Sequence, residues 1–194
     1  MWIYLIRHAE TDGNLQRIVQ MPNTPLSTRG HQQAQCLANA YSQVPISNIV
    51  SSDYARTQST ASALQKQVNC PMSLNELLRE RHFGDLRGKA YDDIDHDFFA
   101  LNYHPPGGES YSQFVDRIGK AWQQLTELAN QQKGDTVVVS HGLVLRCILT
   151  EILMLPSQLL AQTDIQNTSV TKVNLDDYTD IPMLCDVGHL NDMT

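Results

Sequence analysis

Cysteine is scarce in this chain, and its spacing excludes two kinds of site. The 194 residues include four widely separated cysteines, and no two of them form a Cys-x-x-Cys pair. Small disulfide frameworks and structural zinc sites need dense or closely paired cysteines. We therefore expect free thiols and a cytoplasmic protein. The seven histidines form no His-x-x-x-His pair, and the aspartates of 92–97 lack a calcium loop's glycine and terminal glutamate. We expect neither a metal nor a cofactor.

Long apolar runs are also absent. The apolar segment 2–6 runs straight into Arg7, so we expect no signal peptide. The longest apolar run, 143–155, is interrupted by Arg146 and Glu151. A membrane-spanning helix needs about 20 apolar residues. The run is therefore expected to be a buried helix, and no contact with a membrane is expected.

Positive charge is in deficit, with 14 lysines and arginines against 21 aspartates and glutamates and a formal net charge of −7. Non-specific nucleic-acid binding needs a basic face, so nucleic acid is not an expected partner. A phosphorylated small molecule stays open, because a local cluster of arginines can oppose the overall sign. The length of the chain predicts one domain over residues 1–194, and the sequence leaves a homodimer open.

Segments of strand-like and helix-like pattern alternate along the chain. This order predicts an α/β fold of three layers, α/β/α, in which helices flank a mostly parallel central sheet. The expected strands are 2–7, 48–51, 72–76 and 136–140, with two late strands at 169–174 and 183–186. The expected helices are 28–42 with Thr28 as its cap, 54–67, 109–132, and 143–155 stopped by Pro156. Segment 88–108 is expected to form a short helix and a loop, a lid over the site.

Two of the expected strands end on a histidine. Arg7 and His8 follow the first strand, and His141 and Gly142 follow the strand at 136–140. Loops at strand ends are where α/β proteins place their chemistry. An imidazole there can act as a nucleophile, and a guanidinium beside it can hold a phosphate in a planar two-point contact.

Further blocks of residues accompany this pair in a specific order. They are Arg7-His8-Ala9-Glu10-Thr11 with Asn14, Pro25-Leu26-Ser27 with Arg29-Gly30, Arg56, Glu80, Gly108-Glu109-Ser110, His141-Gly142 and Asn167-Thr168-Ser169. With these blocks the chain resembles the histidine phosphatase superfamily, the phosphoglycerate mutase-like family, from Met1 to about Val173. One departure is Ala9, which stands where the family most often has glycine. Alanine would be strained there if φ had to be positive.

The resemblance implies a role for each catalytic candidate. His8 is the expected nucleophile, which becomes phosphohistidine. Arg7 and Arg56 are expected to grip the phosphoryl group from two sides, where charge stabilisation matters most. A protonated His141 is expected to donate to phosphoryl oxygens, and Glu80 to be the general acid and base.

The remaining candidates are expected to bind substrate or to compete for a role. Asn14 and Gln20 match positions that contact the phosphate or its ester, and Arg81 is expected to shape selectivity. Gly142 opens a helix whose free N–H groups would face an anion. Glu76 is the nearest competitor of Glu80 as the acid. We interpret the block at 108–110 as structural, with Glu109 and Ser110 in the first turn of a helix.

A serine-hydrolase elbow is the other interpretation of the strand end at 136–140. That motif requires Gly-x-Ser-x-Gly, and Val138-Val139-Ser140-His141-Gly142 lacks the first glycine. We therefore favour phosphoryl chemistry over acyl transfer at this strand end.

Three functions are compatible with the blocks. We predict a phosphatase that hydrolyses a phosphomonoester of a small metabolite, because the segment before Gly-Gly-Glu-Ser is short where mutases carry a long insertion. Water would then reach the phosphohistidine more easily. The second interpretation is a mutase of the phosphoglycerate type. The third is a protein that binds phosphorylated ligands without turnover.

Overall fold

A six-stranded sheet of order β3-β2-β4-β1-β5-β6 runs through the protein. A computed structural model describes residues 1–161, 163–191 and 193. Its strands are β1 (Trp2–Arg7), β2 (Ile46–Ser51), β3 (Met72–Leu74), β4 (Asp135–Ser140), β5 (Val170–Asn174) and β6 (Met183–Asp186). β1 to β4 are parallel, and β5 pairs antiparallel with both of its neighbours. The expected mostly parallel sheet is confirmed.

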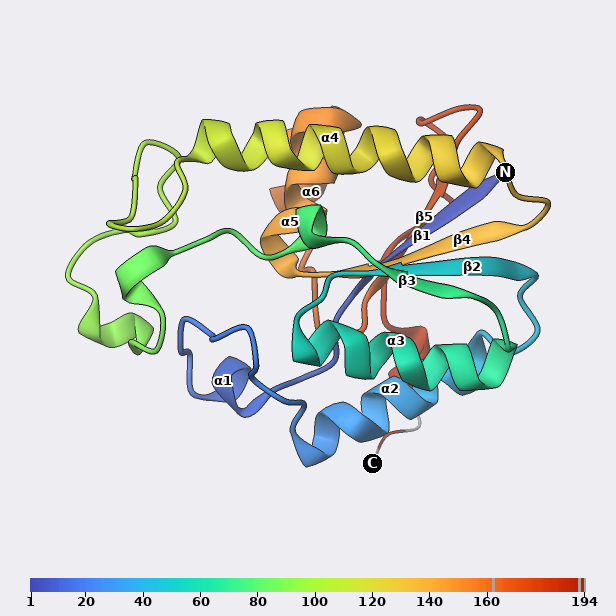
Figure 1. Cartoon of the computed structure of the whole chain (residues 1–194), viewed down its shortest axis with the longest axis horizontal. Coiled ribbons are helices and arrows are strands. Elements are labelled where there is room, and N and C mark those ends of the chain that lie inside the picture. Colours follow the sequence, from blue (N-terminus) through green and yellow to red (C-terminus); the bar gives the residue numbers. More distant parts are fainter. Residues whose placement is uncertain (162, 192, 194) are drawn as a thin grey trace.

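Helices cover both faces of this sheet, which confirms the three-layer α/β/α architecture. The helices are α1 (Asp12–Leu15), α2 (Thr28–Ala40), α3 (Ala55–Val68), α4 (Tyr111–Asn130), α5 (Gly142–Cys147) and α6 (Ser157–Ala161). α2 and α3 lie on one side of the sheet, and α4, α5 and α6 lie on the other (Figure 1).

Strand β1 shows why both faces need cover. Ile3 and Leu5 are buried in the apolar cluster beneath α4 and α5. Tyr4 and Ile6 are buried in a second cluster with residues of α2 and α3. Because side chains alternate along a strand, an unbroken apolar strand presents apolar groups to both faces. The sheet is therefore stable only between two helical layers.

Helix α2 is capped by Ser27 and not by Thr28, which is its first residue, and it ends at Ala40, two residues earlier than expected. The Ser27 hydroxyl accepts the N–H of Gly30 at 3.0 Å and donates to the Glu10 carboxylate at 2.9 Å. A cap must precede the helix with an extended backbone, and Ser27 has that geometry. Its bond to Glu10 ties the helix start to the loop after β1.

Other element ends also differ from expectation. β3 stops before Glu76, because Asn75 caps a 3₁₀ turn, Glu76–Leu78, by accepting the N–H of Leu77 at 2.9 Å. The last long helix is shorter than 143–155. α5 passes into a π-helix, Ile148–Ile152, and the chain turns at Met154, where φ is +53°, before it reaches Pro156.

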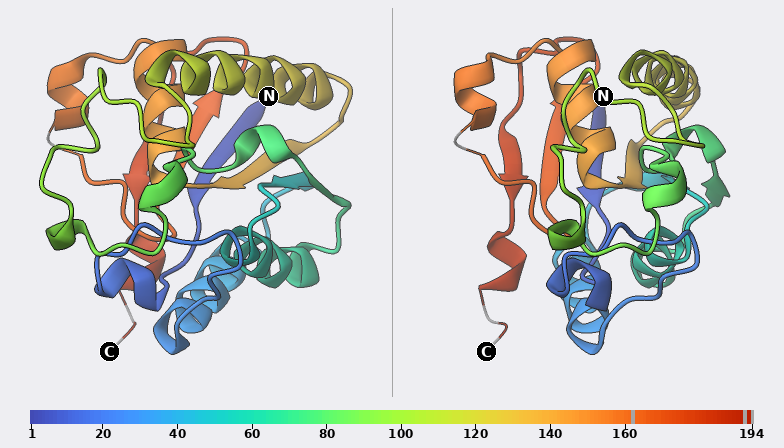
Figure 2. Two further views of the ribbon diagram at one scale, coloured as in Figure 1. Left: turned by 60° about the vertical axis from the view of Figure 1, so that its left-hand side comes forward. Right: turned by 90° about the vertical axis from the view of Figure 1, so that its left-hand side faces the viewer.

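The segment between residues 84 and 108 lies beyond the carboxyl ends of the parallel strands (Figure 1, Figure 2). Its regular structure is limited to two 3₁₀ turns, Gly84–Leu86 and Tyr91–Asp93, in keeping with the expected short helix and loop. Phe83, Leu86 and Phe98 are buried in a small apolar cluster with Val19, which belongs to the loop after β1. The segment is thus packed against that loop at the end of the sheet where the strand ends gather.

Two glycine substitutions test how closely α2 packs against the loop after β1. A Cβ on Gly30 would lie 2.0 Å from the carbonyl oxygen of Glu10, whereas a Cβ on Gly119, midway along α4, meets nothing within 4 Å. We expect Gly30→Ala to lower the free energy of unfolding by about 2 kcal/mol or more. Gly119→Ala should raise it by about 0.5–1 kcal/mol, because alanine is the better helix former. Urea unfolding of both variants measures these changes. An unchanged free energy of unfolding in Gly30→Ala would contradict the close approach of Gly30 to the Glu10 carbonyl.

Candidate active site

The candidate site lies where β1 and β4 end side by side. The two strands are parallel, with Arg7 opposite Ser140, so that His8 and His141 follow at neighbouring strand ends. Their imidazole rings are 5.3 Å apart between centroids. Ser52, which follows the neighbouring β2, reaches the same place, with its hydroxyl 3.0 Å from His141 Nε2. Parallel pairing alone thus brings together histidines 133 positions apart in the sequence.

The backbone around His8 is held from several sides. The His8 N–H donates to the Ser140 carbonyl at 2.9 Å, and the Asn167 side-chain amide donates to the His8 carbonyl at 2.9 Å. The Ala9 N–H donates to the Thr60 hydroxyl at 3.0 Å. Ala9 does not have a positive φ, so alanine is unstrained at this position. The departure from glycine therefore carries no conformational cost.

The His8 ring is fixed in one tautomer. Its Nδ1 lies 2.8 Å from the Ala9 carbonyl oxygen, which can only accept, so Nδ1 carries the hydrogen. Nε2 therefore holds the free electron pair, and Arg56 Nε lies 3.2 Å from it. The pKa of His8 is lowered well below its usual value by burial and by the nearby charges of Arg56 and Arg7. A neutral ring with its electron pair on Nε2 is the form that can attack phosphorus.

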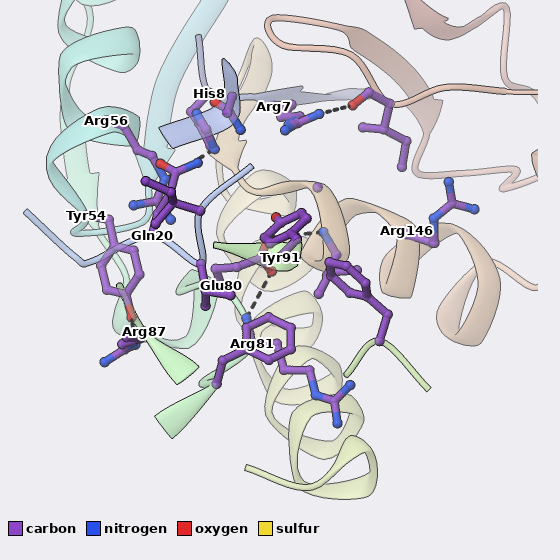
Figure 3. A pocket seen from close by; sticks show the side chains of 18 of the residues that line it. Arg7, His8, Gln20, Tyr54, Arg56, Glu80, Arg81, Arg87, Tyr91 and Arg146 are labelled. Atoms are coloured by element: carbon purple, nitrogen blue, oxygen red, sulfur yellow. Dashed lines mark hydrogen bonds between the residues drawn. The ribbon is translucent and has the colours of Figure 1, made fainter. Parts of the chain in front are cut away.

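Around His8 is a cavity of about 240 Å³. Figure 3 shows His8, Arg7, Arg56 and Glu80 extending toward it from different elements. The expected site residues that line it are Arg7, His8, Asn14, Gln20, Arg56, Glu80, Arg81 and Gly142. The structure therefore gathers these residues, which are scattered through the sequence, around one space.

Arg7 and Arg56 form the basic floor of the cavity. Arg7 Nη1 donates to the Ile165 carbonyl at 2.6 Å, and its buried Nε has no partner among the described residues. Arg56 is buried and donates through Nη1 to the Met21 carbonyl at 3.0 Å. Burial lowers the pKa of both guanidinium groups, that of Arg56 to about 10. Both stay charged at neutral pH, with N–H groups available to an anion.

Glu80 sits where it can exchange a proton with a group bound in the cavity. Its carboxylate accepts the N–H of Arg81 at 2.9 Å and the N–H of Leu143, in the first turn of α5, at 3.3 Å. Burial raises the pKa of Glu80, and it outweighs those two bonds and the charges of Arg56 and Arg7, which act in the opposite direction. A carboxyl group with a raised pKa can hold a proton for a leaving group.

Glu76, the sequence's competing acid, lies elsewhere. Its side chain is 72% exposed and pairs with Arg79 at 2.9 Å. It does not line the cavity around His8. Of the two glutamates that the sequence offered as the acid, Glu80 therefore lines the cavity and Glu76 does not.

His141 does not line the cavity. Its side chain is completely buried behind His8 and against Tyr54, whose ring centroid is 5.2 Å away. Burial lowers the pKa of His141 well below its usual value, and Arg56 and His8 lower it further. Its Nδ1 has no partner among the residues that the structure describes. In this arrangement His141 is a neutral, buried ring next to the His8 ring, and its expected role as a donor stays a prediction.

Asn14 and Gln20 are oriented by their oxygens. The Asn14 Oδ1 accepts the Thr11 N–H at 3.1 Å and the Asn167 amide at 3.3 Å, and the Gln20 Oε1 accepts the Thr11 hydroxyl at 2.9 Å. Within the described part of the chain, neither amide nitrogen donates to a protein group. These nitrogens are therefore donors that line the cavity with capacity for an anion.

Arg81 and Gly142 form other parts of the wall. The Arg81 guanidinium is buried, donates to the Tyr103 carbonyl at 2.5 Å and lies 5.5 Å from the centroid of the Phe83 ring. A Cβ on Gly142 would lie 3.6 Å from Nε of Arg7, so that glycine keeps space beside this guanidinium.

The block at 108–110 supports the acid loop from outside the cavity. Ser110 caps α4 and forms a capping box with Gln113, so Glu109 precedes the helix and does not lie in its first turn as expected. Glu109 accepts the N–H of His82 at 2.8 Å and is ion-paired with Arg117. Its carboxylate therefore fixes the loop that carries Glu80, and the block is structural.

The match to a family model decides the identity of the fold. The model of the histidine phosphatase superfamily (branch 1) matches residues 3–183. The chain belongs to this superfamily. Its members act as phosphatases or phosphomutases.

Relatives of this chain carry both kinds of name. A probable phosphoglycerate mutase, GpmB, of Shigella boydii is 30% identical over 182 residues, which cover 89% of this chain and 84% of the relative. Among solved structures, Bacillus stearothermophilus YhfR has a TM-score of 0.84 and 28% identity, over 98% of this chain and 99% of that one. A mycobacterial glucosyl-3-phosphoglycerate phosphatase in complex with VO3 has a TM-score of 0.79 and 26% identity, over 96% and 97%.

Several residues of the site escaped sequence reasoning. Tyr54 lines the cavity, and its ring centroid lies 5.1 Å from the Arg56 guanidinium and 5.9 Å from that of Arg87. Arg87 also donates to the Tyr54 hydroxyl at 2.6 Å. Tyr54 could have been found from its place shortly after β2, whereas Arg146, on α5, appeared in the sequence only as an interruption of an apolar run.

The cavity around His8 is cationic although the chain is acidic. Its lining acids are Glu80 and Asp164, and its lining arginines are Arg7, Arg56, Arg81, Arg87 and Arg146. No group of three or more possible metal ligands occurs in 1–161, 163–191 and 193. In the same described part, no helix has the length and apolarity needed to cross a membrane. The local charge therefore favours an oxyanion.

Burial of the two neutral histidines makes stability depend on pH. Because the pKa of His8 and of His141 is lowered in the folded state, the unfolded chain binds more protons below pH of about 6.5. The free energy of unfolding is therefore expected to fall as the pH drops from 7 to 5. We expect His141→Gln to reduce this loss, as measured by urea unfolding at each pH. His31→Gln, at an exposed position of α2, should leave the loss unchanged. An equal loss in all three proteins would contradict the assignment.

Proposed function

We propose that this protein is a metal-independent phosphatase that hydrolyses a phosphomonoester of a small metabolite through a phosphohistidine. The observation that carries the proposal is the state of His8. Its Nδ1 is held by the Ala9 carbonyl, so the electron pair lies on Nε2, where it accepts a hydrogen bond from Arg56 Nε. The same cavity is lined by Arg7 and by Glu80.

The first step transfers the phosphoryl group to the protein. The phosphate of the substrate binds between Arg7 and Arg56, and Arg56 Nε turns from His8 to a phosphoryl oxygen. His8 Nε2 then forms a bond to phosphorus while the bond between phosphorus and the ester oxygen breaks. Glu80 gives its proton to the departing alkoxide, so the alcohol leaves neutral.

The second step hydrolyses the phosphohistidine and regenerates His8. Glu80, now a carboxylate, takes a proton from water, and the water oxygen attacks phosphorus. The N–P bond breaks, phosphate is released, and His8 recovers its electron pair while Glu80 is again protonated. A single carboxyl group can serve both steps because its raised pKa lies closer to the working pH than that of an ordinary glutamate.

Mutase activity is the second candidate, favoured by the printed name of the relative from Shigella boydii. A mutase must keep water from the phosphohistidine until a second acceptor binds. Here the segment 84–108 is short, and Phe99, which lines the cavity, is 41% exposed. A cavity whose wall is itself open to solvent supports hydrolysis over transfer. A protein that only binds phosphorylated ligands would have no use for the proton-holding Glu80.

Turnover of p-nitrophenyl phosphate tests the proposed reaction. We expect hydrolysis that EDTA leaves unchanged, and a fall in kcat/KM of more than about 1,000-fold in His8→Ala, because the attacking atom is removed. His31→Ala, an exposed histidine of α2, is the matched control and should be fully active. Retention of most activity by His8→Ala would remove His8 from the mechanism, and loss of activity with EDTA would show that a metal takes part.

Glu80→Gln separates the two steps. p-Nitrophenolate leaves without needing a proton, so His8 is still phosphorylated, but glutamine accepts no proton from water. We expect a burst of about one p-nitrophenol per protein, then turnover slowed by about 100-fold or more. Acid-labile phosphate should accumulate on the protein. A linear time course at the rate of the unmodified protein would assign the base to another residue.

A further inference from the structure

A second cavity adjoins the cavity around His8. It has a volume of about 290 Å³. The residues that line both cavities are Arg81, Phe99, Leu143 and Arg146. The other residues that line the second cavity are Leu101, Tyr111, Phe114 and Cys147. None of its lining residues takes part in the proposed chemistry, so its occupant has to be argued from its own surface.

The charged residues that line the second cavity are Arg81 and Arg146, which it shares with the cavity around His8, and its other lining residues are apolar or neutral. Burial raises the pKa of the Cys147 thiol to about 12 and that of the Tyr111 phenol to about 12, so both groups are neutral. The Tyr111 hydroxyl is engaged, donating to Glu151 at 3.1 Å. The part of the second cavity that lies away from these two arginines is therefore uncharged and mostly apolar, and such a surface favours an apolar group.

Two aromatic rings and a guanidinium group, all planar, line this cavity. The rings of Tyr111 and Phe114 lie 6.2 Å apart between centroids, and the Arg81 guanidinium lies 5.8 Å from the Tyr111 centroid. Planar rings and guanidinium groups stack best on another planar π system. A cavity of about 150 Å³ can hold benzene. The second cavity is larger, so it has room for an aromatic group.

Two apolar side chains at this cavity are left open to water. Leu101 is 65% exposed and Phe99 is 41% exposed. An aromatic group that entered between them would cover their apolar surface, and this gain would add to its affinity. Because Phe99 and Leu143 belong to both cavities, a single ligand can reach from the phosphate position into the second cavity.

We infer that the second cavity receives an aromatic group on the alcohol part of the substrate. The substrate is then a phosphomonoester whose phosphate is held at His8 and whose planar apolar portion is held between Leu101, Tyr111 and Phe114. This inference rests on the proposed phosphatase activity for its chemistry. It adds the substrate class, because a phosphorylated sugar acid would leave the second cavity empty.

A series of primary alkyl phosphates tests the inference without changing the leaving oxygen. Ethyl, phenethyl and naphthylethyl phosphate differ in the group that can enter the second cavity. We expect kcat/KM for phenethyl phosphate to exceed that for ethyl phosphate by about tenfold or more, since the ring leaves water for an apolar site. Equal values for ethyl and phenethyl phosphate would overturn the inference and leave the phosphatase intact.

Variants place the effect in the second cavity. Leu101→Ser and Tyr111→Ala should each lower the ratio of kcat/KM between phenethyl and ethyl phosphate by about threefold or more. Leu74→Ser, at an exposed leucine on β3, is the matched control and should leave both values unchanged. A ratio that neither cavity variant lowers would overturn the inference.

Binding of phosphonates separates this inference from the proposed reaction. Phenethylphosphonate and ethylphosphonate cannot be hydrolysed at their P–C bond, and calorimetry measures their affinity whether or not the protein turns over. We expect tighter binding of phenethylphosphonate, and Leu101→Ser should weaken it. This result without any turnover of p-nitrophenyl phosphate would support the aromatic site and overturn the phosphatase. Turnover with equal affinity for both phosphonates would do the reverse.

Discussion

The hydrogen bond from His8 Nδ1 to the carbonyl of Ala9 is the interaction on which the site depends. It determines which ring nitrogen holds the electron pair. That carbonyl is in turn held in place by the Ala9 N–H bond to Thr60, and the start of the loop by the Ser140 carbonyl. The sheet, helix α3 and the loop after β1 therefore together fix the orientation of the His8 ring. A ring free to rotate would offer its hydrogen as often as its electron pair.

Desolvation is the second constraint, and it acts on acids and bases in opposite directions. It keeps His8 and His141 neutral and helps Glu80 keep its proton. The cost is that Arg7 and Arg56 are buried beside each other with few acids to match them. An oxyanion between them would relieve this cost, so the cavity is complementary to a negatively charged group.

Much of the fold could be predicted from pattern, because strand and helix periodicity are local properties. Strand 2–7 and the two histidine-bearing strand ends lie as predicted. The predictions that were wrong concern the ends of helices, where single residues determine the boundary. Ser27 rather than Thr28 caps α2 and also bonds to Glu10, and the chain turns at Met154, so the last long helix ends earlier than predicted.

The candidate site was predictable in its residues and not in its geometry. Blocks in family order identified the residues around His8, but only packing shows that His141 is buried behind the nucleophile and that Glu76 points to solvent. The second cavity has no signal in the sequence, since Leu101, Tyr111 and Cys147 come from a loop and two helices and meet only in the folded chain. Arg146 was hidden for the same reason.

In the proposed reaction, the excess of arginines around the cavity acts on product release as well as on substrate binding. Inorganic phosphate has the same oxygens as the phosphoryl group that Arg7 and Arg56 are proposed to hold, so the cavity would retain the product by the contacts that bind the substrate. An enzyme built in this way is slowed as its product accumulates. Its working rate would then follow the phosphate supply of its surroundings as well as the concentration of its ester.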